Sequence, residues 1–188
     1  MGKKIIITMI YIFYFCLFVV LAYVIFFDKA SASEQEVGYS LLTEHLIGDR
    51  EPMAKFSHKI NNNGLISNPI ISLRFTNADE DCYDSFTLFG GQNSVGSSMG
   101  GVMGGTGFYL NKNIQTGLVY GGYLQDVTEF NRRGMASSFF DNGRIGFVPV
   151  LGGEINFKVK VSDRVFIKQN NTISPFVTNH SISVGVEF

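Results

Sequence analysis

The last eight residues of the chain alternate strictly between apolar side chains and small or polar ones. Ile182, Val184, Val186 and the terminal Phe188 share one face of an extended strand, and the residues between them are serine, glycine or glutamate. In a soluble sheet, an edge strand of this kind would leave four apolar side chains in water. The alternation therefore predicts a strand with one face toward lipid and the other toward a polar interior.

The rest of the chain beyond residue 33 shows little helical periodicity. Short β-rich runs are separated by clusters of Asn, Asp, Gly and Ser. Eight is the smallest even number of strands for a closed antiparallel membrane barrel. The runs predict strands at residues 36–47, 65–76, 82–93, 98–110, 114–126, 144–161, 165–171 and 178–188.

The lengths of the connections alternate along the chain. Long segments at 48–64 and 127–143, and a Gly/Ser stretch around 94–97, take turns with short ones at 77–81, 111–113 and 162–164. Outer-membrane barrels have long loops outside and short periplasmic turns. We therefore predict an all-β fold, an eight-stranded antiparallel transmembrane β-barrel in a cell outer membrane, and we expect it to be a monomer.

The first 32 residues are predicted to be an export signal that precedes the barrel of residues 33–188. Lys3 and Lys4 are followed by an uncharged apolar run over residues 5–27 and by a small-residue cleavage site ending at Ala32. The apolar run exceeds the roughly 7 to 15 residues usual for a signal. About 20 such residues cross a bilayer as a helix, so an uncleaved anchor that carries a soluble β-domain is an alternative.

Composition excludes several classes of function. The net charge is −1 and no basic stripe is present, so nucleic acid is not expected as a partner. Removal of the signal leaves Cys82 as the only cysteine, which excludes an internal disulfide and gives no basis for a metal site. Familiar catalytic and phosphate-binding motifs are absent, and no cofactor is expected.

One group of residues at the predicted extracellular rim has catalytic potential. The first strand would end near His45, and the third near Asn93 and Ser94. A serine hydroxyl becomes a nucleophile when a base such as histidine takes its proton. An amide can orient the imidazole or donate to an oxyanion. Histidine and serine are equally ordinary in polar loops, so the alternative is a rim without chemistry.

These positions resemble the outer-membrane lipid A palmitoyltransferases and their divergent relatives, some of them carried by bacteriophages. In outline the resemblance covers the whole of residues 33–188. Its short motifs are TEHL at 43–46, GQNS at 91–94, TGLVYGG at 116–122 and FVPVL at 147–151. Members of that family move an acyl chain from a phospholipid to lipid A, and the barrel interior holds this acyl chain.

The resemblance implies a role for each matching residue. The base would be His45, the second essential polar group Ser94, and Asn93 would stand in place of the family's aspartate. Inward-facing glycines would make room for the acyl chain, and prolines that interrupt strand pairing would admit lipids sideways. The implied acyl-pocket residues are Gly117 and Gly121, and the implied access residues are Pro69 and Pro149.

The chain departs from the family in two respects. No amphipathic helix precedes the barrel, and Asn93 cannot ionise to stabilise an imidazolium. The pair Asp84 and Ser85 matches the family's letters better than Asn93 and Ser94. It lies near the start of the third strand, however, and thus at the opposite rim from His45.

A non-enzymatic barrel is the rival interpretation. In this alternative the outer loops 48–64 and 127–143 bind or mask something at the cell surface. Arg132 and Arg133 in the second of these loops suit phosphate oxygens or solvent equally well. Few charges fall in the predicted strands, and this scarcity favours the apolar interior that an acyltransferase needs. The main charged residues in the strands are Arg74, Glu154, Lys158 and Glu187.

Overall fold

The computed structural model describes most of the chain after the predicted export signal. The described residues are 33–45, 58–59, 65–67, 69–93, 96–128, 131, 140–175 and 177–188. The signal at 1–32 lies outside them, as do the predicted loop residues Arg132 and Arg133. Among the described residues, no helix has the length and hydropathy needed to cross a bilayer.

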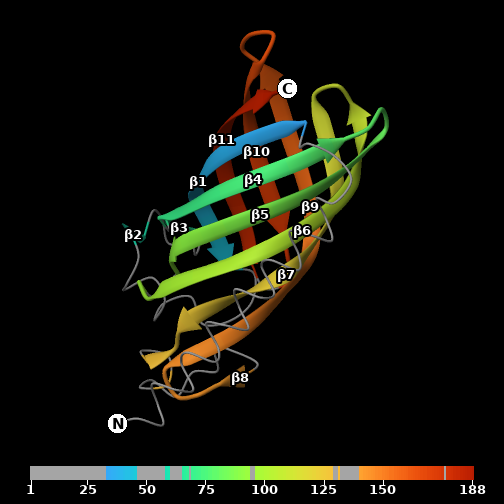
Figure 1. Ribbon diagram of the computed structural model, residues 1–188. Coiled ribbons are helices and arrows are strands. Elements are labelled where there is room, and N and C mark those ends of the chain that lie inside the picture. Colours follow the sequence, from blue (N-terminus) through green and yellow to red (C-terminus); the bar gives the residue numbers. More distant parts are fainter. Residues whose placement is uncertain are drawn as a thin grey trace. The chain divides into compact units, whose positions relative to one another are not determined.

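Eight long strands form one closed antiparallel sheet (Figure 1). They are β1 (Glu34–His45), β4 (Ile70–Ala78), β5 (Cys82–Gln92), β6 (Ser98–Asn111), β7 (Ile114–Asp126), β9 (Ile145–Lys160), β10 (Val165–Ile173) and β11 (Val177–Glu187). Three short strands lie in the connections: β2 (His58–Lys59), β3 (Leu65–Ser67) and β8 (Phe140–Asp141). The barrel closes because β1 pairs with both β4 and β11.

The predicted strands agree with the observed ones with one correction. The predicted strand 65–76 is divided at Pro69, which lies between β3 and β4 rather than inside a strand. Proline has no N–H to give to a ladder, and its carbonyl here accepts a hydrogen bond from the N–H of Gln92 at 3.2 Å. Pro69 therefore starts a strand instead of interrupting one.

The three short turns of the prediction are observed, although the connection between β10 and β11 at the other end, residues 174–176, is equally short. The turns between β4 and β5, β6 and β7, and β9 and β10 are short and lie at the end of the barrel that carries the C-terminus. Ser33 ties the start of β1 to this same end, because its carbonyl accepts from the N–H of Phe188 at 3.0 Å. By the rule for outer-membrane barrels, this end is periplasmic.

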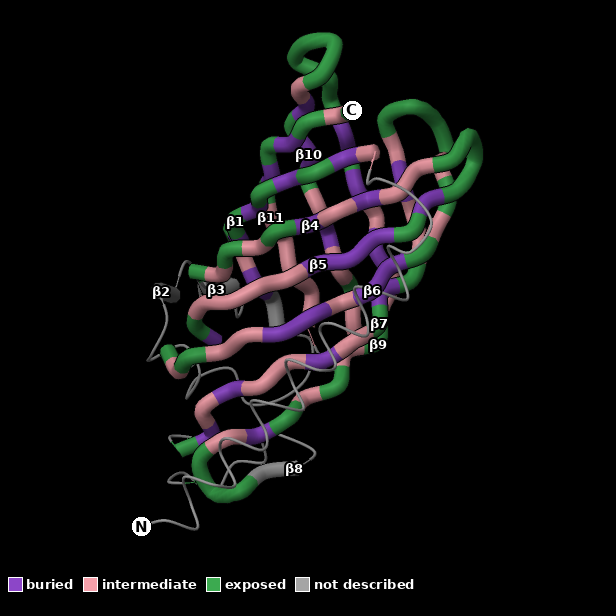
Figure 2. The backbone as a smooth tube through the Cα atoms, viewed as in Figure 1, coloured by how far each residue is buried: buried purple, intermediate pink, exposed green. Residues whose placement is uncertain are grey.

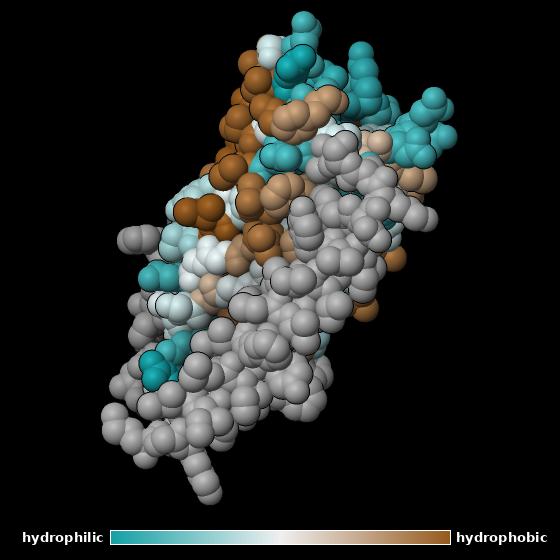
Figure 3. All heavy atoms as spheres, in the orientation of Figure 1, coloured by the Kyte–Doolittle hydropathy of each residue, from teal (hydrophilic) through white to brown (hydrophobic). Residues whose placement is uncertain are grey.

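The two faces of the wall differ in the way that the sequence predicted. Buried and exposed residues alternate along the strands in Figure 2, and apolar side chains gather on the visible outer wall in Figure 3. The most exposed are Phe188, Leu151, Val161, Ile71, Val159, Leu118, Val37, Leu110 and Val184, each more than half exposed. Because water would not tolerate so many large apolar side chains on one surface, this wall faces lipid.

The wall is not equally long all round. The last pair between β9 and β10 joins Gly153 to Ile173, and β9 continues past it through residues 145–152. Over that stretch β9 pairs with β7 on one side and meets β8 only at Gly146 and Phe147 on the other. The hairpin of β7 and β9 therefore extends beyond the end of β10.

Candidate functional site: the lumen and the outer rim

The barrel interior is crossed by charged side chains that meet near the periplasmic end. Glu154 of β9 receives two hydrogen bonds from Arg74 of β4, from Nη1 at 2.7 Å and from Nη2 at 2.8 Å. The hydroxyl of Tyr83 in β5 donates a third, at 2.7 Å. All three side chains are buried or nearly so, and the paired geometry is the strong form of an arginine–carboxylate contact.

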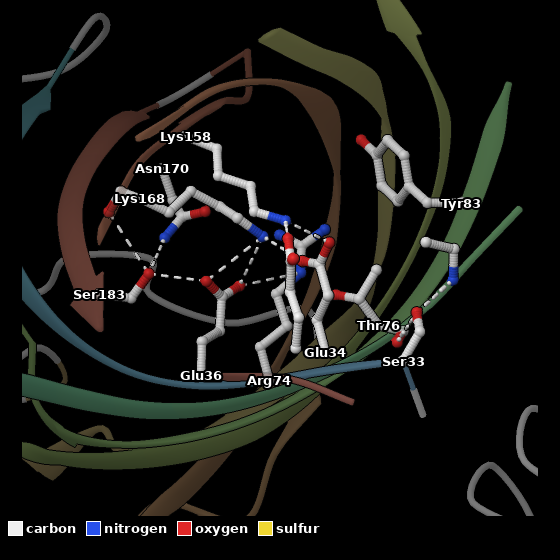
Figure 4. A network of polar contacts seen from close by, with 12 residues as sticks. Ser33, Glu34, Glu36, Arg74, Thr76, Tyr83, Lys158, Lys168, Asn170 and Ser183 are labelled. Atoms are coloured by element: carbon white, nitrogen blue, oxygen red, sulfur yellow. Dashed lines mark hydrogen bonds and ion pairs between the residues drawn. The ribbon is translucent and has the colours of Figure 1, made fainter. Parts of the chain in front are cut away.

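A second set of contacts continues the network toward β10 and β11 (Figure 4). The ammonium group of Lys168, fully buried, lies 3.2 Å from Glu34 and 3.4 Å from Glu36. Lys158 contacts Glu34 at 2.6 Å and also contacts Glu187. Glu36 joins the two sets, since its carboxylate lies 3.5 Å from Nε of Arg74.

These residues are called the lumen network below. Its members are Glu34, Glu36, Arg74, Tyr83, Glu154, Lys158, Lys160, Lys168, Ser183 and Glu187. Four carboxylates face four cations, so the network is electrically balanced. Desolvated charges are tolerated in a protein interior when they are paired in this way. The side chains come from β1, β4, β5, β9, β10 and β11, so they tie opposite walls together.

Aromatic rings and glycines complete the packing around the network. The ring of Phe166 lies 4.4 Å from Nζ of Lys158 and 5.1 Å from Nζ of Lys168. A Cβ at Gly185 would meet that ring at 2.3 Å, so only glycine leaves room for it. A Cβ at Gly117 would likewise lie 2.7 Å from the Tyr83 hydroxyl oxygen.

The expectation of an apolar interior is wrong for this half of the barrel. That expectation rested on few charges in the strands and left out Glu34, Glu36 and Lys168, which are all buried here. Glu34 precedes the predicted start of the first strand. A signal was nevertheless available, because Glu34 and Glu36 alternate with the exposed Gln35 and Val37. Inward-facing charges on one strand require partners across a closed barrel.

Toward the extracellular end the inner face becomes less polar along β6, β7 and β9. The alternation in these strands places Met103, Val119, Gly121 and Val150 on the inner face, and Gly121 pairs with both Met103 and Val150. Of the two implied acyl-pocket residues, Gly121 lies in this apolar zone. Gly117 lies at the level of the lumen network, paired with Glu154.

Two of the three implied catalytic positions, His45 and Asn93, lie where β1 and β5 end, at one rim of the barrel. β1 and β5 run the same way, with β4 between them, and end at His45 and Gln92. The side chain of His45 and the whole of Ser94 lie outside the described residues. Their catalytic roles remain predictions.

Asn93 is buried and holds the connection between β5 and β6. Its Nδ2 donates to Oε1 of Gln125 at 2.7 Å, and its Oδ1 accepts from the N–H of Ser97 at 2.9 Å. Its backbone N–H donates to the Ser97 carbonyl at 2.9 Å. These bonds give Asn93 a structural task at the rim.

The structure also shows where Ser85 of the rival pair and the second access residue, Pro149, lie. Ser85 is buried near the start of β5, opposite Thr76, and so lies at the other end of the barrel from His45. Pro149 lies inside β9 and pairs with Gly122, in the stretch where β9 has passed the end of β10. Proline is compatible with such a strand edge.

Among the described residues, no group of three or more His, Cys, Asp or Glu side chains is arranged to hold a metal ion.

No known protein family and no curated protein matches this sequence. Solved structures of membrane barrels are similar at low identity. The N-terminal β-barrel domain of Pseudomonas aeruginosa OprF matches with 9% identity and a TM-score of 0.40, covering 85% of this chain and 100% of that one. Neisserial surface protein A (NspA) matches with 8% identity and a TM-score of 0.44, covering 82% and 95%.

The Yersinia pestis attachment invasion locus protein Ail, crystallised with the heparin analogue sucrose octasulfate, is a third similar structure. It is 14% identical, with a TM-score of 0.43, and the match covers 82% of this chain and 95% of Ail. Such likenesses concern the fold alone. The closed antiparallel sheet, the apolar outer wall and the polar interior make this chain an eight-stranded β-barrel of the outer-membrane type.

Proposed function

We propose that the chain is a non-enzymatic surface barrel, exported to the outer membrane as a monomer, whose extracellular loops bind or mask surface components. The lumen network carries this proposal. Its balanced, buried charges occupy the part of the interior that a channel or a deep acyl-chain well would need. Function is then left to the extracellular end.

Loop composition indicates the chemistry of the partner. The connection at 127–144 carries Arg132, Arg133 and Arg144 against Glu129 and Asp141. Paired guanidinium groups suit sulfate, phosphate and carboxylate oxygens, which they contact in a fork-like geometry. The partner class that fits best is therefore an anionic polysaccharide at the cell surface.

The test is binding by the purified full-length barrel in nanodiscs. Fluorescein-labelled dextran sulfate is the probe, and neutral dextran of the same length is its control. We expect binding to the sulfated probe only, weakened several-fold by Arg132→Ala with Arg133→Ala, because each guanidinium contact to an anion adds to affinity. Lys112→Ala, in a short turn at the opposite end, is the matched control. Equal binding of both dextrans would refute the proposal.

Acyl transfer is the second candidate, and one observation favours it. β1 and β5 end at the same rim, beside an inner wall that carries Gly121 and Val119. In this proposal His45 is the base, Ser94 and Asn93 are the polar partners, Gly117 and Gly121 leave room for the chain, and Pro69 and Pro149 admit phospholipid and lipid A.

The lipid A mass decides between the candidates. The chain would be expressed in an outer membrane that lacks its own palmitoyltransferase, beside empty cells and cells with Ser94→Ala. Acyl transfer predicts a gain of one acyl chain in lipid A, lost in the variant. An unchanged mass with the folded protein in the outer membrane would reject acyl transfer and leave the surface-binding proposal standing.

A further inference from the structure

A group of polar side chains interrupts the apolar outer wall on β10 and β11. Along β11 the outward positions are apolar from Phe188 to Ile182 and then change to His180. Along β10 the exposed Ile167 is followed on the same face by Gln169 and Asn171. We call Gln169, Asn171 and His180 the wall cluster. Polar and ionisable residues that face lipid are costly and mark functional sites.

The wall cluster is held together by its own hydrogen bonds. Asn171 pairs with His180 in the sheet, and its Oδ1 lies 2.7 Å from Nδ1 of His180. The same oxygen accepts from Nε2 of Gln169 at 3.1 Å. Nδ2 of Asn171 donates to the carbonyl of Ile155 in β9 at 2.8 Å, which fixes the orientation of the amide. Asn171 is buried, whereas Gln169 is exposed and His180 is half-buried.

These contacts decide which groups the cluster offers outward. Because Oδ1 of Asn171 can only accept, Nδ1 of His180 carries the proton in the contact between them. A neutral ring then presents Nε2 as an acceptor. The amide of Gln169 adds a free acceptor oxygen and a second N–H beside it. The cluster thus matches a ligand that carries hydroxyl or amide groups.

The depth of the cluster places it near the outer interface. Phe188 is 77% exposed and follows the periplasmic end of β11, where aromatic side chains mark the inner interface. His180 lies eight residues farther along, which at roughly 3.3 Å per residue and a tilt of about 40° is about 20 Å higher. The apolar band is about 25 Å tall, so His180 lies in its outermost part, just below the lipid head groups.

We propose that the wall cluster binds the head group of a sugar-based lipid of the outer leaflet, of the lipid A type. The contacts would go to hydroxyl and amide groups of the head group and not to its phosphates, because a phosphate would require a cation and the outward positions of the described strands β9, β10 and β11 carry neither lysine nor arginine. A sugar lipid supplies hydroxyl and amide donors at this depth. Its acyl chains would run down the wall along the exposed Ile182, Val184 and Ile167.

This inference depends on the barrel lying in an outer membrane but not on the loop-binding or acyl-transfer proposals. The experiment is native mass spectrometry of the purified full-length barrel in detergent, titrated separately with lipid A and with phosphatidylethanolamine. We expect one retained lipid A per barrel. We expect Gln169→Leu with His180→Leu to weaken retention about tenfold, because two hydrogen bonds to the head group are lost.

Two further variants separate a lost site from a lost fold. Gln35→Leu removes an exposed outward polar side chain elsewhere on the wall, and should leave retention unchanged. His180→Gln keeps a polar group and should retain lipid A better than His180→Leu. Equal retention by the wild type and the double leucine variant would overturn the proposal. Stronger retention of phosphatidylethanolamine than of lipid A would also overturn it, because the cluster would then bind a phospholipid. A dimer mass that disappears in the double leucine variant would overturn it as well, because the cluster would then bind a second copy of the barrel.

Discussion

Replacing Glu154 by glutamine should destabilise the barrel far more than the loss of one surface charge would. Glu154 is 3% exposed and receives both guanidinium hydrogen bonds and that of Tyr83. Glu154→Gln keeps the size of the side chain but leaves the buried Arg74 without its main counter-charge. Breaking a buried ion pair in this way costs about 3 to 5 kcal/mol.

A double-mutant cycle separates pairing from packing. Arg74→Met alone leaves Glu154 unpaired, whereas Arg74→Met with Glu154→Gln restores a neutral lumen network. We therefore expect the double variant to lose about 2 kcal/mol less free energy of unfolding than the sum of the two single variants. Urea unfolding from phospholipid vesicles, followed by circular dichroism because the chain has no tryptophan, measures each free energy. Additive losses, or a cost below about 1 kcal/mol for Glu154→Gln, would contradict the buried pairing.

Three other predictions follow from the same structure. The purified wild-type barrel should pass few ions in a planar bilayer. The triple variant with Arg74→Ala, Glu36→Ala and Glu154→Ala should have a higher conductance, because the lumen network is opened. An unchanged conductance in a folded variant would count against a closed lumen. Asn93→Ala should lower stability by about 1 to 3 kcal/mol and speed proteolysis between β5 and β6, because it removes the buried hydrogen bond from Nδ2 of Asn93 to Oε1 of Gln125. His58→Ala, in the connection that contains β2, is the control and should change neither. Cys82 is exposed beside the turn between β4 and β5. It should resist a membrane-impermeant maleimide in intact cells and react after the outer membrane is opened. Labelling in intact cells would show that the barrel has the opposite orientation.

The strands were predictable because period two is a local property of the sequence. The alternation along β11 and β7 can be read without knowing which strands are neighbours. The single error in the strands came at Pro69, where two short runs were merged across a residue that cannot donate to a ladder. Connection lengths then gave the orientation of the barrel, since turns and loops alternate in sequence order.

The interior was harder to predict because its contacts are distant in sequence. Arg74 and Glu154 are 80 residues apart, and Lys168 and Glu34 are 134 apart. Nothing near Lys168 in the sequence shows that its ammonium meets two carboxylates of β1. The wall cluster was missed for a different reason. The predicted strands 165–171 and 178–188 contain Asn171 and His180, but only the register of β10 against β11 places the two residues side by side on the outer face.

The unequal length of the wall gives the barrel an oblique mouth. β9 runs through residues 145–152 beyond the last residue of β10, which amounts to roughly 20 Å of extra height at about 3.3 Å per residue and a tilt of about 40°. The low side, made by β10 and β11, opens at the level of the lipid head groups. The high side carries the ends of β7 and β9 well above them. A large molecule approaching from outside therefore meets the hairpin of β7 and β9 first, whereas a lipid diffusing in the outer leaflet reaches only the low side.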